Sequence, residues 1–240
     1  MILLIIDFGN FDLVVKIFHF FFKKTKKLNK IEIETKENFS QLLNLDKVCA
    51  FRKTDEQWGG LSNMKAKVYP LKVNNYRIDN SESLYQMCRF QDYPEIQKMI
   101  VDNPSPMGSK MKSKKYRKTH TRLDFEEVKV DIMNWCIQVK LCCNPNGFGL
   151  LLEQTGNRLI VEISHKDKFW GVVEDKNQPG LYHGNNVLGQ LLMKLRDSYI
   201  QNKNSLSHLK VEPLDIENFK FLGIEIETIY NPGYVKTEVR

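Results

Sequence analysis

The feature that most constrains this chain is an apolar stripe near its middle. Six large or apolar side chains recur there at helical spacing: Phe125, Val128, Ile132, Trp135, Cys136 and Val139. This spacing places them on one face of a helix that begins near Asp124, with Glu127 three residues further on. Such a face must pack inward, and with 42% hydrophobic residues the chain can bury a sizeable core.

Two more helices are predicted, one on each side of this stripe in the sequence. The first starts near Asp79, with Glu82 at the spacing of a capping box, and it ends before Pro94. The other opens at residues 184–186 and carries an apolar side made of Leu188, Leu191, Leu192, Leu195 and Tyr199. Both patterns are typical of amphipathic helices that pack on a core.

A strand is predicted between the second and third helices. Residues 159–164 alternate, with Glu162 facing away from the apolar side chains at 159, 161 and 163. Helices packed around a small, mostly antiparallel sheet make the predicted fold class α+β. The predicted domain spans residues 49–202, between an N-terminal extension over 1–48 and a C-terminal extension over 203–240.

Charge and cysteine content limit the chemistry. The chain has 36 Lys and Arg against 29 Asp and Glu, a net charge of +7 that favours an anionic partner. Its five cysteines are odd in number and show no C-x-x-C spacing, which argues against a disulfide framework and a structural zinc site. The histidines are scattered and no glycine-rich phosphate loop occurs. We therefore expect an intracellular, cytoplasmic protein with no metal and no cofactor.

The apolar N-terminus is predicted to be buried structure rather than a membrane anchor. Asp7, Asp12 and Lys16 interrupt it, so no run of about 18 uncharged apolar residues occurs. A signal peptide carries its positive charge before the apolar run, whereas here the lysines of residues 23–27 follow it. An interfacial anchor is the alternative.

Four polar positions have both a structural and a functional interpretation. Glu82 lies in the first turn of its helix, either as a capping acid or as a catalytic carboxylate that the helix dipole keeps ionised. Asp167 precedes an F-W-G sequence, and an acid beside an exposed aromatic suits a ribose and a flat ring, although Trp170 could equally plug the core. Asn185 and Asn186 head a helix whose free amides could receive a phosphate, or the asparagine there is an ordinary N-cap. Lys140, at the edge of the stripe, is either partly desolvated or snorkels to solvent.

Six segments occur in the order of the motifs of a known family. They are residues 60–64 (GLSNM), 81–90 (SESLYQMCRF), 105–110 (SPMGSK), 155–171, 184–189 (GNNVLG) and 192–196 (LMKLR). The first three are similar to G-x-F-S-N-F, S-E-H-x-x-Q-x-x-K-F and S/T-P-x-x-A-K. In this pattern the chain resembles the NADAR superfamily, the YbiA-like N-glycosidases, over about residues 50–200 and in neither extension.

The resemblance implies an α+β domain that hydrolyses the N-glycosidic bond between a ribose and an amino group on a base. Known substrates of such proteins are phosphoribosylamino-pyrimidine intermediates of riboflavin synthesis and, in other members, ADP-ribose attached to guanine. The expected partner is therefore a small phosphoribosyl or ADP-ribosyl substrate, with modified nucleic acid as a further candidate. The implied catalytic residues are Glu82, Asp167 and Lys140. The implied substrate-binding residues are Asn63, Arg89, Lys110, Glu162, Trp170, Gly184, Asn185 and Arg196.

Two departures from the family pattern bear on the chemistry. Ser83 stands where the family has His, and Arg89 stands where it has Lys. A guanidinium stays protonated, so Arg89 cannot act as a nucleophilic amine, but it can hold a phosphate in a bidentate contact. The two departures leave a non-catalytic nucleotide-binding module as one interpretation.

Two routes of bond cleavage stay open. In the first, Glu82 stabilises an oxocarbenium-like state while Asp167 or Glu162 orients water. In the second, the ribose opens and its aldehyde is captured as a Schiff base by Lys140 or Lys110. The basic run over residues 110–118 favours a nucleic-acid substrate over a small molecule, although such a run is usually a solvated loop.

Overall fold

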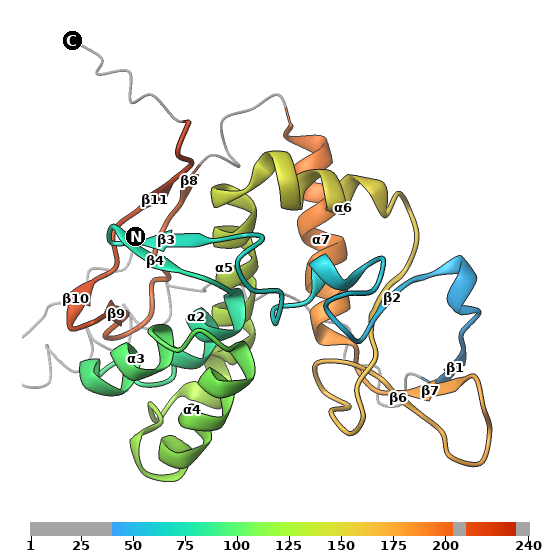
Figure 1. The fold of residues 1–240 in the computed structure, drawn as a ribbon, viewed down its shortest axis with the longest axis horizontal. Helices are drawn as coiled ribbons and strands as arrows, with labels where there is room; N and C mark the ends of the chain where they lie inside the picture. The colour runs from blue at the N-terminus through green and yellow to red at the C-terminus, as the bar shows by residue number, and fades with distance from the viewer. Residues whose placement is uncertain (1–39, 204–209, 234–240) are drawn as a thin grey trace, which may run out of the picture. The chain divides into compact units, whose positions relative to one another are not determined.

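The computed structural model describes residues 40–203 and 210–233, and one long helix lies between its other helices (Figure 1). This helix, α5, spans Phe125–Cys143 and begins after Asp124, where the apolar stripe predicts it. All six stripe residues are buried. Because α5 contacts α2, α7 and strands of two small sheets, it is the element on which the rest of the domain packs.

Three helices pack together on one side of α5. They are α2 (Ser81–Met87), α3 (Pro94–Val101) and α4 (Pro106–His120). A proline at the first helical position starts α3 and α4, and Ser105 caps α4 by accepting a hydrogen bond from the amide of Gly108 at 3.2 Å. All seven residues of α2 are buried, whereas the buried residues of α4 are Ser109 and Ser113. The polar helix α4 therefore covers α2.

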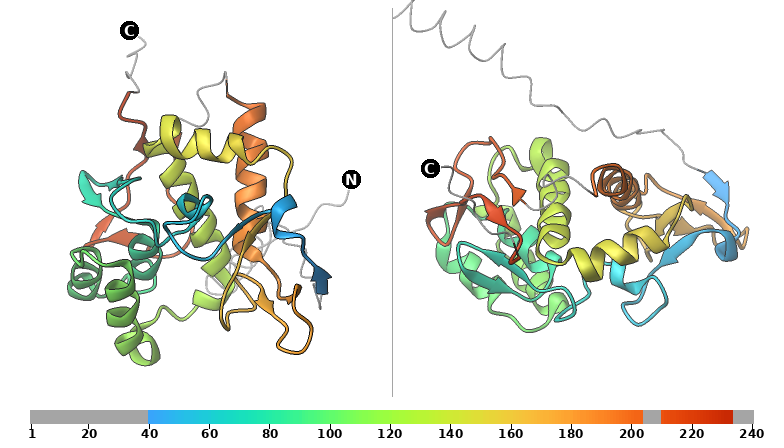
Figure 2. Two further views of the ribbon diagram at one scale, coloured as in Figure 1. Left: turned by 45° about the vertical axis from the view of Figure 1, so that its right-hand side comes forward. Right: turned by 90° about the horizontal axis from the view of Figure 1, so that it is seen from above.

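On the other side of α5 lie α6 (Leu150–Gln154), α7 (Val187–Gln201) and a pair of parallel strands (Figures 1 and 2). β2 (Cys49–Phe51) pairs with β5 (Ile160–Glu162), which is the strand expected over residues 159–164. The helix expected from residues 184–186 onward begins at Val187, and the five residues of its predicted apolar side are buried. α7 packs on both β5 and α5.

The remaining strands form small antiparallel sheets. They are β3 (Leu71–Val73) with β4 (Tyr76–Ile78), β7 (Leu181–His183) between β1 (Ser40–Leu42) and β6 (Val173–Glu174), β8 (Lys210–Val211) with β11 (Ile229–Tyr230), and β9 (Lys220–Phe221) with β10 (Ile224–Glu225). Short turns of helix, η1 (Leu45–Lys47), η2 (Gly59–Leu61) and η3 (Pro145–Gly149), join them to the longer elements. The α+β class is confirmed, with its strands divided among several sheets.

The described part of the C-terminal segment packs on the domain that was predicted to end at residue 202. The indole Nε1 of Trp135 donates a hydrogen bond to the carbonyl of Glu212 at 3.0 Å, and its ring meets Phe219 edge-on, with centroids 4.9 Å apart. The amide of Gln97 in α3 donates to the carbonyl of Lys220 at 3.0 Å. Residues 210–233 thus complete the core around α3 and α5.

The predictions for the N-terminal apolar run fall on residues 1–39, outside the described part of the chain. Within residues 40–203 and 210–233, no helix combines the length and the apolar character needed to cross a membrane.

The start of α2 differs from the predicted capping box. The side chain of Asn80, not Asp79, caps the helix by accepting a hydrogen bond from the amide of Ser83 at 2.8 Å. Asp79 pairs instead with the exposed Arg77 at 3.2 Å. The cap lies one residue later than the spacing suggested, so Glu82 is not the partner of a capping box and its carboxylate is available for other contacts.

This difference gives a test of which residue stabilises α2. Asn80→Ala should lower the free energy of unfolding by about 1 kcal/mol, because a buried helix start loses its cap. Asp79→Ala removes an exposed ion pair and should change it by less than about 0.5 kcal/mol. Urea unfolding of both variants measures the difference, and a larger loss for Asp79→Ala would contradict the assignment.

Candidate active site

The candidate site is built on a loop that Lys140 anchors. Lys140, from α5, donates hydrogen bonds through Nζ to the carbonyls of Gly60 at 2.8 Å and Ser62 at 3.1 Å. Its ammonium lies 4.2 Å from the ring centroid of Phe148, and burial lowers its pKa to about 7. Of the two interpretations of Lys140, the structure agrees with desolvation and not with snorkelling, since the side chain is buried. Its amine is directed to the loop backbone rather than to the acidic residues of the site.

The anchored loop continues into Asn63, which joins it to α2. The carbonyl of Asn63 accepts a hydrogen bond from the amide of Glu82 at 3.0 Å. The side-chain Nδ2 of Asn63 points to the sulfur of Met133 at 2.9 Å, while its buried Oδ1 has no partner among the described residues. Because an unpaired buried acceptor is costly, this oxygen is suited to receive a donor group of a bound substrate.

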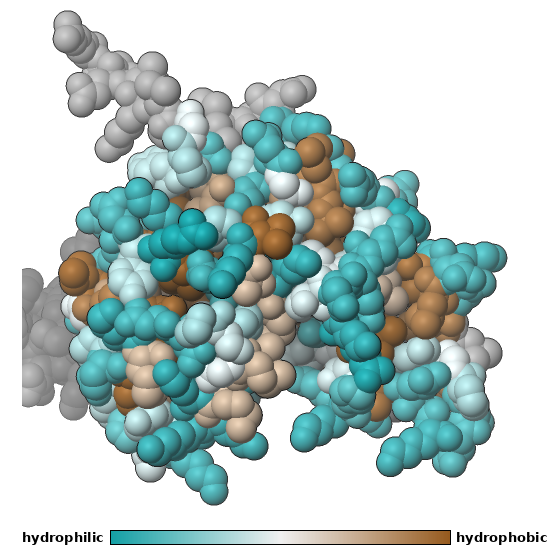
Figure 3. Space-filling model, in the orientation of Figure 1, coloured by the Kyte–Doolittle hydropathy of each residue, from teal (hydrophilic) through white to brown (hydrophobic). Residues whose placement is uncertain are grey.

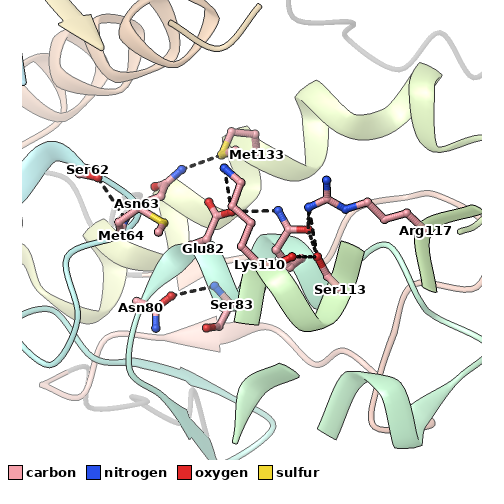
Figure 4. Close-up of polar contacts among 11 residues, drawn as sticks. Ser62, Asn63, Met64, Asn80, Glu82, Ser83, Lys110, Ser113, Arg117 and Met133 are labelled. Atoms are coloured by element: carbon pink, nitrogen blue, oxygen red, sulfur yellow. Dashed lines mark hydrogen bonds and ion pairs between the residues drawn. The ribbon is translucent and has the colours of Figure 1, made fainter. Parts of the chain in front are cut away.

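Glu82 occupies the middle of a polar network (Figure 4). Its carboxylate oxygen Oε1 accepts a hydrogen bond from Nε2 of Gln86 at 2.9 Å and lies 3.7 Å from Nζ of Lys110. The residue is 6% exposed, and among the described residues Oε2 makes no hydrogen bond. Gln86 and Lys110 therefore hold one oxygen of the side chain, and the other is left for a ligand.

Gln86 is itself held by α4, which fixes the direction of its amide. Its oxygen accepts hydrogen bonds from Oγ of Ser113 at 2.8 Å and from Nη2 of Arg117 at 2.9 Å, so its NH2 group must face Glu82. Lys110, Ser113 and Arg117 lie three and four residues apart on one face of α4. Figure 4 shows this face turned toward α2.

Glu162 brings a second carboxyl group to the site from the end of β5. Burial raises its pKa to about 7, with further contributions from the negative charges of Glu82 and Asp167 and a smaller opposing one from Lys110. Near neutral pH this group is divided between its protonated and ionised forms. It can therefore donate a proton, while the ion-paired Glu82 offers a negative charge.

Asp167 shapes the loop that carries Trp170. Its Oδ1 accepts hydrogen bonds from the amides of Phe169 and Trp170, both at 3.0 Å. The half-buried Trp170 ring packs edge-on against Tyr85 of α2, with centroids 5.6 Å apart. The oxygen Oδ1 of Asp167 thus has a structural role. Its hydrogen bonds place the Trp170 ring beside the helix that carries Glu82.

The start of α7 does not offer free amides to a phosphate. The amides of residues 186–188 donate to the carbonyls of residues 169–171 at 3.0–3.2 Å, and that of Asn185 donates to Lys168 at 2.6 Å. The expectation of a phosphate site at these amides is therefore not met. Gly184 has a φ of +148°, and a Cβ there would lie 2.4 Å from the carbonyl oxygen of Gly171, so the close backbone approach requires glycine.

Asn186, the second asparagine of the predicted helix start, fixes the strand that carries Glu162. Its Oδ1 accepts the amide of Glu162 at 3.1 Å and its Nδ2 donates to the carbonyl of Ile160 at 2.8 Å. It adopts a left-handed conformation with φ of 49°, which asparagine tolerates better than most residues. The Asn pair after Gly184 is the sequence signal for this turn.

Two predicted substrate-binding arginines have different surroundings. Arg196 is buried in α7, where Nη1 donates to the carbonyl of Arg158 at 2.8 Å and to Oγ1 of Thr155 at 3.2 Å. It holds a turn and makes no contact with Glu82 or with the other acids of the site. Arg89 lies just beyond α2 with its guanidinium 3.6 Å from the ring centroid of Phe125.

Sequence reasoning missed Gln86, Ser113 and Arg117 as parts of the site. The signal for Gln86 is its spacing four residues after Glu82 on one helix face. Ser113 and Arg117 lie within a basic run that, in sequence, is typical of a solvated segment, and only the packing of α4 on α2 reveals their role. Within the described residues no three His, Cys, Asp or Glu side chains are grouped so as to hold a metal ion.

Comparison with known proteins gives one family and several relatives. The NADAR domain family matches residues 50–199. A riboflavin biosynthesis protein of Vibrio vulnificus is 31% identical over 149 residues, covering 61% of this chain and 37% of that protein. An N-glycosidase of Acanthamoeba polyphaga mimivirus is 37% identical over 78 residues, covering 30% of this chain and 45% of that protein. The chain thus spans less than half the length of these curated relatives.

A solved structure has a similar fold. The NMR structure of the Escherichia coli protein YbiA is 28% identical, with a TM-score of 0.54, and the match covers 69% of this chain and 92% of that one. The likeness supports the α+β arrangement around α5.

The raised pKa of Glu162 predicts a pH dependence of stability. The native carboxyl keeps its proton up to about pH 7, whereas the unfolded one loses it near its ordinary value of 4.5. The wild-type free energy of unfolding should therefore contain a component that falls as pH rises from about 4.5 to 7, on the order of 1–3 kcal/mol. Glu162→Gln should remove that component.

Urea unfolding at several pH values between 4.5 and 8 measures it, as the difference between wild type and Glu162→Gln. Glu126→Gln, at a side chain that is 76% exposed, is the matched control and should keep the wild-type profile. A Glu162→Gln profile parallel to that of the wild type would show that the carboxyl of Glu162 titrates normally.

Proposed function

This chain belongs to the NADAR family, and from that premise we propose that it is an N-glycosidase, which hydrolyses the bond between a ribosyl carbon and an amino nitrogen on a base. The observation that carries the proposal is that one site contains two carboxyl groups in different environments. Glu82 is paired with Lys110, while the pKa of Glu162 is raised to about 7. The name of the mimivirus relative, an N-glycosidase, supports the same reaction class.

In the proposed mechanism the two carboxyl groups divide the work. The Glu82 carboxylate stabilises positive charge as the bond between C1′ and nitrogen breaks, and protonated Glu162 gives its proton to the leaving nitrogen. Water adds to C1′ and gives its proton to the now ionised Glu162. The products are a ribose with a hydroxyl at C1′ and a free amine, and Glu162 is again protonated.

Other residues would orient the substrate. The unpaired Oδ1 of Asn63 can accept a ribose hydroxyl. Trp170, fixed by Asp167, offers a ring near α2 for the base. The Gln86 amide, fixed from α4, keeps the Glu82 carboxylate in one orientation before substrate arrives.

For the substrate, we propose the phosphoribosylamino-pyrimidine intermediates of riboflavin biosynthesis. The support comes from relatives named as riboflavin biosynthesis proteins, in Vibrio vulnificus and in plants. The chain spans less than half of each of these relatives. The family match over residues 50–199 includes both Glu82 and Glu162.

A second candidate substrate, ADP-ribose on guanine in nucleic acid, is favoured by the surface of α4. This helix has the sequence PMGSKMKSKKYRKTH, and its lysines are exposed beside the candidate site. Lys110 links that cationic surface directly to Glu82. A non-catalytic binding module is the third interpretation, and it predicts binding without base release.

Glu82→Gln tests the proposed chemistry. Removal of the negative charge should lower the rate of base release at least about 100-fold, because the developing positive charge loses its stabilising partner. The amide has nearly the same shape and can still contact Gln86, so thermal unfolding should change little. Release of free base from a phosphoribosylamino-pyrimidine and from an ADP-ribosylated guanine oligonucleotide measures the effect and identifies the substrate.

Glu126→Gln serves as the control, since its side chain is exposed on α5. Equal turnover by Glu82→Gln and wild type would reduce Glu82 to a structural residue. Binding of either compound without release, by the wild type, would favour the binding module.

Borohydride trapping distinguishes the carboxylate route from the Schiff-base route. The amine of Lys140 donates hydrogen bonds to two carbonyls, and that of Lys110 is ion-paired with Glu82. We therefore expect neither amine to attack an opened ribose. Mass spectrometry after reduction in the presence of substrate should therefore detect the unmodified chain. An adduct that disappears in Lys110→Met but persists in Lys114→Met would establish the Schiff-base route.

A further inference from the structure

Arg89 carries a charge that the described part of the protein does not balance. Its guanidinium stacks 3.6 Å from the ring centroid of Phe125 and forms no hydrogen bond or ion pair with any described residue. Its Nε is buried and has no partner among the described residues. Burial accordingly lowers its pKa to about 10. A largely buried guanidinium is normally paired with an anion, and here that place is open.

Arg117 reaches the same region from α4. Its Nη2 donates to Gln86 at 2.9 Å and to Ser113 at 3.1 Å, but its Nε is buried without a partner among the described residues. Arg117 thus contacts a side chain three residues before Arg89, and its positive charge further lowers the pKa of Arg89. Two neighbouring arginines, each with an unpaired buried N–H, point to an anion that binds between them.

The acidic neighbours do not fill that role. Glu82 and Glu126 act on Arg89 only at longer range and form no ion pair with it. The oxygen Oε1 of Glu82 is occupied by Gln86 and Lys110, while Glu126 pairs with Lys129.

The spacing along α2 relates this pair to the proposed reaction centre. Glu82, Gln86 and Arg89 are four and three residues apart, so they follow one face of the helix and its first turn beyond. Glu82 and Arg89 are separated by about 10 Å along the axis. Arg117 reaches Gln86, between them. An elongated substrate along this face would place one end at Glu82 and the other at the two arginines.

We propose that Arg89 and Arg117 form a phosphate subsite, which binds the phosphate carried on C5′ of the ribosyl substrate while C1′ lies at Glu82. The inference rests on the proposed function for the identity of the substrate. The planar guanidiniums bind phosphate oxygens in parallel pairs, and stacking on Phe125 keeps Arg89 in position without neutralising it. The subsite therefore selects phosphorylated ribosides over unphosphorylated ones.

Equilibrium binding of the full chain tests the subsite with ribose 5-phosphate, ADP-ribose and ribose as probes. The measured quantity is the ratio of the dissociation constants of ribose and its phosphorylated counterpart. We expect Arg89→Gln and Arg117→Gln each to reduce the wild-type ratio about 10-fold or more. Arg77→Gln, at a side chain that is 65% exposed, should leave the ratio unchanged. If the binding of ribose 5-phosphate depends on the arginines, the subsite binds a phosphomonoester. If only the binding of ADP-ribose depends on them, the subsite binds a diphosphate.

Arg117→Gln also removes the hydrogen bond that holds Gln86. This loss would weaken the binding of all three probes equally, so it would not change the ratio of their dissociation constants. Should Arg89→Gln fail to fold, Arg89→Lys keeps the charge without the planar fork and is expected to lower the ratio less. Ratios within twofold of the wild type in both Arg117→Gln and the folded Arg89 variant would overturn the subsite.

The outcome is separable from that of the proposed function. Arg-independent binding together with Glu82-dependent base release would remove the subsite and keep the N-glycosidase. Arg-dependent binding of phosphorylated ribose without base release from either substrate would keep the subsite and remove the N-glycosidase.

Discussion

The site depends on the burial of a short polar helix. α2 has seven residues, all buried, and four of them are polar: Ser81, Glu82, Ser83 and Gln86. Buried polar groups are tolerated only when they are paired, so each neighbouring element must offer a partner. Asn80 caps the helix, and α4 supplies serines and basic side chains at the correct spacing. This requirement explains why α4, which buries so little apolar surface, packs on α2.

Burial also gives the carboxyl groups of Glu82 and Glu162 different properties. Glu82 lies where Gln86 and Lys110 can reach it, whereas Glu162 ends a strand in surroundings that disfavour its charge. The first group influences the second, since the negative charge of Glu82 is one cause of the raised pKa of Glu162. A proton donor and a stabilising anion thus arise from one amino-acid type in two environments. This difference requires that α2 and β5 keep their positions relative to each other. The hydrogen bonds of Asn186 to the backbone of β5 hold the strand in place.

The sequence predicted the elements better than their connections. The stripe of α5 and the apolar side of α7 could be read because helical periodicity is local and is repeated over several turns. The cap of α2 was misplaced by one residue, because Asp79 and Asn80 are both competent caps and only the chain path selects between them. The pairing of Arg117 with Gln86 joins residues 31 positions apart, which no local pattern encodes. Motif order found Glu82 and Glu162, but not the surroundings that differentiate them.

The packing of residues 210–233 on α5 has a consequence for how the chain folds as it is made. Trp135 is produced well before Glu212 and Phe219, the residues that cover its indole. Until those later residues leave the ribosome, one side of the central helix carries exposed aromatic surface. Helices α2 to α7 can assemble locally, but the last contacts span about 80 residues of chain and form late. During that interval the nascent domain is at its most vulnerable to aggregation, and a chaperone that shields α5 would act then.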